Sequence, residues 1–160
     1  TLLKAFYFFS KKNKDYKLLM LGKGKLEVKL KKLVESLKIK DRVVFKGWVK
    51  NTSSYLNTSK LFILSSVYEG LGNVLIDAIN QNTPCISTDC HSGPREILLN
   101  GKGGYLVKIK SPKLLAEKMN YCINNYAEAL KKNTIAKKKL NRFLIAEQSK
   151  KYFDYLLKNH

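Results

Sequence analysis

The stretch LFILSSVYEGLGNVLIDAINQN, residues Leu61–Asn82, changes its hydrophobic pattern at a turn that contains two glycines. Its first four residues form an apolar run of strand length, whereas residues 73–82 repeat apolar positions with helical spacing. The turn EGLG, residues 69–72, therefore follows the carboxyl end of a strand and precedes a helix. Open parallel sheets bind ligands at such strand ends. The stretch predicts an α/β fold with a ligand site at this turn.

The same alternation of short apolar runs and helical patterns continues along the chain, which predicts a mainly parallel sheet with helices on both faces. The expected strands are residues 16–21, 43–45, 61–64, 85–87 and 105–107. The expected helices are residues 26–37, 51–59, 73–82, 94–99 and 112–124. The chain also opens in a helical pattern and is helical and lysine-rich from residue 125 onward. An apolar face is expected near the end, at Tyr152, Phe153, Tyr155, Leu156 and Leu157.

Length and composition favour one globular domain, with 160 residues of which 44% are hydrophobic. No apolar run approaches the ~20 residues that a membrane span requires. The net charge of +19 comes from 28 lysines and three arginines against 12 acids. Nucleic-acid readers favour the arginine fork. We therefore interpret the charge first as a solvated surface, second as attraction to an anionic membrane surface, and only third as nucleic-acid binding.

The three cysteines, Cys85, Cys90 and Cys122, have no zinc-finger spacing and are expected to be reduced thiols in a cytoplasmic protein. Gly22 and Gly24 follow the first expected strand, as a dinucleotide fingerprint would, but the third glycine is absent. No P-loop pattern occurs in the sequence. Dinucleotide binding and P-loop chemistry are therefore disfavoured, and either a ligand-facing turn or an ordinary tight turn remains open for these two glycines.

Two carboxylates, Glu69 and Asp77, flank the turn. If Asn73 caps the helix, the first free N–H groups and the positive end of the helix dipole form a phosphate site. Asp77 would lie roughly 6 Å along the axis at ~1.5 Å per residue. Carboxylates accept hydrogen bonds from neighbouring hydroxyls, which suits a ribose at Asp77 and a sugar at Glu69. The alternative is that Glu69 is a capping acid and Asp77 an exposed helix residue.

EGLGNVLIDA, followed by TPCISTDCHSGPREILLNGKGGYLV, closely resembles the donor-binding domain of retaining nucleotide-sugar glycosyltransferases of family 4, whose hallmark is E-x7-E. The resemblance extends back through LGKGK and DRVVFKGWVKN and forward to RFLIAEQSKKYFDYL. It implies a Rossmann-like three-layer α/β domain, the C-terminal half of the two-domain GT-B fold. Residues 1–160 are expected to be this single domain, without its first central strand and without the N-terminal acceptor domain. By strand order, the missing strand would lie between the expected strands at residues 16–21 and 61–64.

The resemblance also implies roles for the matched positions. Glu69 would be the catalytic acid that holds the donor sugar, and Asp77, in place of the usual glutamate, would grip the ribose. The other implied donor-binding residues are Gly22, Gly24, Val49, Asn51, Gly70, Leu71, Gly72, Asn73 and Val74. Gly93 would lie in a loop facing the interdomain cleft, whereas Arg95 and Glu96 would cap and anchor the helix that follows.

The function implied is transfer of a sugar, with retention, from a UDP-sugar to a glycan or lipid-linked acceptor in cell-surface polysaccharide or lipopolysaccharide biosynthesis. The nucleotide-sugar is a substrate, so no cofactor is expected, and no metal is expected because the sequence has no D-x-D pair. The expected location is cytoplasmic, at the inner face of the cell membrane. The alternatives are a nucleotide-binding module without catalysis, a basic nucleic-acid-binding domain, and a sugar-nucleotide epimerase, which would lack the acid-glycine turn.

Overall fold

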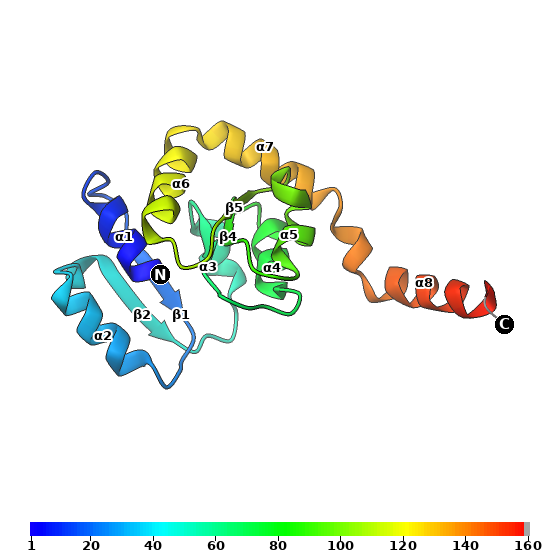
Figure 1. Cartoon of the computed structure of the whole chain (residues 1–160), viewed down its shortest axis with the longest axis horizontal. Helices are drawn as coiled ribbons and strands as arrows, with labels where there is room; N and C mark the ends of the chain where they lie inside the picture. Colours follow the sequence, from blue (N-terminus) through cyan, green and yellow to red (C-terminus); the bar gives the residue numbers. More distant parts are fainter. Residues whose placement is uncertain (159–160) are drawn as a thin grey trace.

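The computed structural model describes residues 1–158 and confirms the alternation of strands and helices (Figure 1). The strands are β1 (Leu18–Leu21), β2 (Val43–Gly47), β3 (Phe62–Leu64), β4 (Cys85–Thr88) and β5 (Tyr105–Val107). The α-helices are α1 (Leu2–Ser10), α2 (Glu27–Ser36), α3 (Ser53–Thr58), α4 (Asn73–Asn80), α5 (Pro94–Ile97), α6 (Pro112–Asn124), α7 (Tyr126–Lys137) and α8 (Ile145–Lys158). Short 3-10 helices are η1 (Lys40–Arg42), η2 (Leu99–Gly101) and η3 (Leu140–Phe143).

All strand pairs are parallel, as predicted, but the strands form two sheets. One sheet contains β1 and β2, with Leu18 opposite Val43. The other has the order β3-β4-β5, with Ile86 opposite both Ile63 and Tyr105. Within residues 1–158, no strand pairing joins β1 to β3. Each of these two strands therefore has one edge whose backbone groups lack a strand partner.

The domain has three layers, with strands in the middle and helices on either side. Successive residues of a strand point to opposite faces, so neighbouring residues of β4 pack into different apolar clusters. Ile86 of β4 belongs to the apolar cluster that β1, β2, α1 and α6 share, in which Phe6 and Leu115 are buried. Its neighbour Cys85 belongs to a second cluster, formed with α4, α5 and α7, in which Leu75 is buried. Helices α1 and α6 pack side by side on the first face (Figure 1). The predicted Rossmann-like arrangement of helices on both faces is therefore confirmed.

A cavity of about 730 Å³ lies between the two sheets. Its walls include residues 18–22 at the open edge of β1 and residues 61–63 at the open edge of β3. Phe6 of α1 and Met119 of α6 line it on one side. The cavity therefore separates the two strands between which the sequence analysis expects a further central strand. That expectation stays a prediction.

Helix α8 extends away from the rest of the domain (Figure 1). The expected apolar residues lie on this helix, and Tyr152, Phe153 and Leu157 are each at least 60% exposed. No residue of α8 is buried. Across residues 1–158, no helix combines the length and the apolar character needed to cross a membrane.

Candidate functional site

The turn between β3 and α4 depends on a glycine in the left-handed conformation. Gly72 has φ +83° and directly precedes α4, whose first residue is Asn73. The carbonyl of Gly72 accepts the Leu75 N–H at 2.8 Å. The residue at the cap position is Gly72, so the prediction that Asn73 caps the helix is wrong. Within residues 1–158, the first N–H groups of α4 have no side-chain acceptor.

The loop that precedes α5 holds this turn in place. The Ser92 hydroxyl lies 2.6 Å from the Glu69 carbonyl oxygen and 3.0 Å from that of Gly70, and donates to this pair. Gly93 has φ +67°, and a Cβ added there would lie 2.0 Å from the Leu71 carbonyl oxygen. Only glycine permits two backbone segments to approach this closely. The turn and the Ser92-Gly93 loop are therefore hydrogen-bonded and closely packed against each other.

Glu69 is half-buried in the loop between β3 and α4. The Ser66 hydroxyl donates a hydrogen bond of 2.6 Å to its Oε1. The carbonyl of Ser66 in turn accepts a hydrogen bond of 2.5 Å from the buried Thr88 hydroxyl of β4. Within the described part of the chain, Glu69 Oε2 accepts no hydrogen bond. The carboxylate is thus oriented by the fold, with one oxygen still free to accept.

Asp77 lies on α4 and lines the cavity between the sheets. Gly22, Val49 and Val74 line the same cavity, so the structure brings four of the predicted donor-binding residues together. They come from the carboxyl ends of β1 and β2 and from the start of α4. Two loops and a helix that are distant in the sequence therefore meet around one space, as a ligand site at the strand ends requires.

The other predicted residues lie outside this lining. They are Gly24, Asn51, Glu69, Gly70, Leu71, Gly72 and Asn73. The side chain of Asn51 has a local structural contact, because its Oδ1 accepts the Ser53 N–H at 2.9 Å at the start of α3. The roles proposed for these residues stay predictions.

The ends of β1 and β2 are tied together beside the cavity. The Gly22 N–H donates to the Gly47 carbonyl at 2.7 Å, and both glycines have positive φ. The side chain of Lys23 lies against Gly47, with its Cε 3.1 Å from where a Cβ would be. Trp48 directly follows β2 and lines the cavity, and the sequence analysis did not single it out. The only signal for it was its place directly after a strand.

Burial determines the chemistry of the three cysteines. Cys85, Cys90 and Cys122 are all buried free thiols. Burial raises the pKa of each thiol, that of Cys122 to about 12. A thiol at Cys90 that stays protonated is a poor nucleophile, although it lies close to Glu69. In residues 1–158, no group of three His, Cys, Asp or Glu side chains is arranged to hold a metal ion.

Arg95 has the anchoring role predicted for it. Its guanidinium forms an ion pair with Asp89 through two hydrogen bonds. Asp89 follows β4, and Arg95 lies on α5. The pair therefore fixes the start of the loop that carries Gly93. No hydrogen bond or ion pair of the Glu96 side chain, within residues 1–158, supports the capping role expected for that residue.

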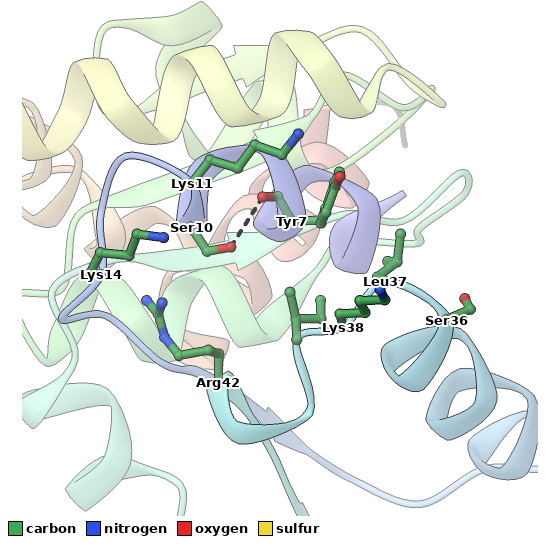
Figure 2. Close-up of a pocket in the computed structure, with 9 residues that line it drawn as sticks. Tyr7, Ser10, Lys11, Lys14, Ser36, Leu37, Lys38 and Arg42 are labelled. Carbon is green, nitrogen blue, oxygen red and sulfur yellow. Dashed lines mark hydrogen bonds between the residues drawn. The ribbon is translucent and has the colours of Figure 1, made fainter.

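A second cavity, of about 520 Å³, lies at the other end of the first sheet, where β1 and β2 begin (Figure 2). Figure 2 shows Lys14 and Arg42 beside the end of α1, together with the hydrogen bond from Ser10 to Tyr7. Arg42 donates hydrogen bonds to the carbonyls of Asn13 and Tyr16 at 2.5–3.0 Å. Its guanidinium therefore holds the loop before β1.

Comparisons with known proteins agree with the arrangement described above. Residues 1–140 match the family model described as "Glycosyl transferases group 1". The chain is 42% identical over 97 residues to an uncharacterized glycosyltransferase of Methanocaldococcus jannaschii, covering 61% of this chain and 24% of that protein. It is 34% identical over 95 residues to the N-acetylgalactosamine-N,N'-diacetylbacillosaminyl-diphospho-undecaprenol 4-alpha-N-acetylgalactosaminyltransferase of Campylobacter jejuni, covering 59% and 26%. The chain thus spans about a quarter of these curated relatives.

Among solved structures, a point mutant of TarM from S. aureus, crystallised in complex with fondaparinux, alpha-GlcNAc-glycerol and UDP, superposes with a TM-score of 0.87. The sequences are 24% identical, and the match covers 95% of this chain and 31% of TarM. This likeness shows that the fold is that of the C-terminal domain of GT-B glycosyltransferases. Because the family model covers residues 1–140 of the 160, the chain belongs to the group 1 family of glycosyl transferases.

Proposed function

We propose that this chain is the donor-binding domain of a retaining, family 4 glycosyltransferase of the E-x7-E type, with Asp77 as the second acid. The donor is a nucleotide-sugar, in the first place a UDP-sugar. The acceptor is a glycan or a lipid-linked sugar in the biosynthesis of a cell-surface polysaccharide or lipopolysaccharide. In this proposal a second domain binds the acceptor, so the present domain binds nucleotide weakly and transfers nothing alone.

The observation that carries the proposal is the convergence of Gly22, Val49, Val74 and Asp77 on one cavity beside the start of α4. The first turn of this helix has free N–H groups and the positive end of the helix dipole, which suit a diphosphate. Asp77 lies one turn further along and faces the same cavity. A ligand with its phosphates on the helix start would place its ribose near Asp77.

The chemical task in such a transfer is to stabilise the charge that builds on the departing diphosphate. Preorganised N–H groups at the start of α4 would do this without rearranging, because Gly72 and the Ser92-Gly93 loop already fix the turn. Glu69 would hold the hydroxyls of the donor sugar through its free Oε2. In the proposed reaction the nucleotide phosphate takes the proton of the acceptor, so that no covalent enzyme intermediate is assigned.

Asp77→Ala is expected to weaken binding of UDP by about 10-fold, because a hydrogen bond to a charged group contributes ~1.5 kcal/mol or more. Calorimetric titration of the wild-type chain and the variant with UDP, GDP and ADP measures this. The side chain of Asp77 is exposed and makes no hydrogen bond within residues 1–158, so the thermal stability should stay unchanged.

Asp154→Ala on the remote helix α8 is the matched control, since it removes the same charge without touching the cavity. Equal affinity of the Asp77→Ala and Asp154→Ala variants for UDP would contradict the ribose role. Tight, salt-dependent binding of duplex DNA that UDP does not displace would favour the nucleic-acid alternative instead.

We also propose an anionic membrane surface as a partner, since a lipid-linked acceptor would lie there. The net charge of +19 and the exposed apolar face of α8 support this proposal. The chain is expected to sediment with vesicles that contain phosphatidylglycerol and to be released by added salt, because screening weakens such attraction. Equal binding to vesicles of pure phosphatidylcholine would contradict the electrostatic argument.

A further inference from the structure

The cavity of about 520 Å³ at the start of β1 and β2 has an unbalanced charge (Figure 2). Four of its lining residues are cations, namely Lys11, Lys14, Lys38 and Arg42. No aspartate or glutamate lines it. Within residues 1–158, none of the four cations forms an ion pair. The cavity therefore gathers positive charge that no carboxylate of the described chain neutralises.

The ends of two helices account for only part of this charge. Ser10 and Ser36, the last residues of α1 and α2, both line the cavity. The C-terminal end of a helix carries roughly half a negative charge, so the two ends together supply about one. About three positive charges remain once both helix ends are counted. The helix dipoles thus explain why cations are tolerated here, but they do not explain how many there are.

Several hydrogen-bond donors of the cavity are not used by the fold. Arg42 donates to carbonyls through its Nε and Nη2, whereas its Nη1 donates to no group in the described chain. The side chains of Lys14 and Lys38 make no hydrogen bond within the same residues. In Figure 2 the terminal nitrogens of Arg42 point toward the ammonium group of Lys14. Like charges that face each other repel, so an anion bound between them would be stabilised.

We propose that this cavity binds a phosphate-bearing anion through Lys14, Lys38 and the Nη1 group of Arg42. Guanidinium and ammonium groups are the side chains that proteins use to bind phosphate. The hydroxyls of Ser10 and Ser36 already donate to carbonyls of their own helices, so the cations carry the recognition. The site lies at the amino ends of β1 and β2, away from the candidate donor site at the carboxyl ends. The proposal therefore goes beyond the proposed function and does not rest on it.

The first test is a titration of the ¹⁵N-labelled 160-residue chain with inorganic pyrophosphate, followed by NMR. The backbone amide signals of Ser10 and Ser36 report on this cavity, so binding at the start of α4 is distinguished by its location. Saturable shifts of these signals are expected. A Lys11→Gln/Lys14→Gln/Lys38→Gln variant, the cavity triple variant, should bind about 10-fold more weakly, because each exposed ion pair contributes roughly two- to fivefold.

The matched control is Lys131→Gln/Lys138→Gln/Lys139→Gln, the control triple variant. It removes the same charge from exposed lysines on α7 and just after it, outside both cavities. Its affinity for pyrophosphate should stay close to that of the wild type. Equal weakening in the two triple variants would reduce the effect to net charge and overturn the proposal, as would the absence of saturable shifts in the wild type. Lys14→Gln alone should weaken binding about threefold and serves if the cavity triple variant does not fold.

A second test identifies the source of the phosphate group, since a lipid headgroup and a soluble phosphate compound share this chemistry. Sedimentation with vesicles that contain phosphatidylglycerol is measured for both triple variants. Binding that is about 10-fold weaker in the cavity triple variant alone would assign the site to a lipid headgroup. Unchanged sedimentation, together with weakened binding of pyrophosphate, would assign it to a soluble phosphate compound. A cavity triple variant that matches the wild type with both probes would overturn the site.

Discussion

Gly93→Ala is expected to lower the free energy of unfolding by at least ~3 kcal/mol, a large part of the ~5–15 kcal/mol that holds a domain together. The added Cβ would lie 2.0 Å from the Leu71 carbonyl oxygen and 2.5 Å from that of Gly70. Both contacts are with backbone, so no side chain can rotate away to relieve them. The positive φ of Gly93 adds strain for any residue that has a Cβ. Urea unfolding followed by circular dichroism measures the loss.

The matched substitution is Gly70→Ala, on the other side of the same contact. Gly70 has no positive φ, and a Cβ there would meet no heavy atom within 4 Å. The free energy of unfolding of the Gly70→Ala variant should therefore stay within about 1 kcal/mol of the wild-type value. Equal stabilities of the Gly93→Ala and Gly70→Ala variants would show that the turn and the Ser92-Gly93 loop are not locked together.

Glu69→Gln is expected to lower turnover by about 100-fold in a longer polypeptide that includes the acceptor domain. The amide matches the carboxylate in size and can still accept the hydrogen bond from Ser66. What it loses is the negative charge that strengthens hydrogen bonds to the donor sugar. Steady-state transfer assays with the nucleotide-sugar measure this effect. UDP affinity of the 160-residue chain should stay unchanged, because the proposal places Glu69 at the sugar.

Glu96→Gln serves as the control for Glu69→Gln. Glu96 is an exposed acid on α5, close along the chain to Gly93 but outside the cavity lining. The turnover of the Glu96→Gln variant should equal that of the wild type. A Glu69→Gln variant with full turnover would refute the sugar role, and one with weakened UDP binding would move Glu69 from the sugar to the nucleotide.

The sequence predicted the strands and helices to within a few residues. Helix α6 and strand β5 have the predicted bounds, because Pro112 starts the helix and the apolar run at residues 105–107 is bounded by polar and glycine residues. The start of β1 differs, since residues 16 and 17 precede the strand. The carbonyl of Tyr16 accepts hydrogen bonds from the Arg42 side chain. This contact joins residues 26 positions apart, so no local sequence pattern reveals it.

The candidate site was predicted in part. Gly22, Val49, Val74 and Asp77 do meet at one cavity, because the carboxyl ends of parallel strands lie at the same edge of a sheet. The cap predicted at Asn73 was wrong, since Gly72 adopts a left-handed conformation that the local sequence allowed but did not require. Trp48 was missed, because hydrophobic periodicity does not distinguish an exposed aromatic ring from a buried one.

The sequence by itself determined the elements, their parallel α/β order and the turn at Glu69, because these follow from local periodicity and from glycine chemistry. Only the tertiary structure decided that the strands divide into two sheets with a cavity between β1 and β3. It also decided that Gly93 packs on the backbone of Leu71, and that Asp77 and Trp48 share one space. These features depend on contacts between residues distant in the sequence, whose geometry is set by the packing of whole layers.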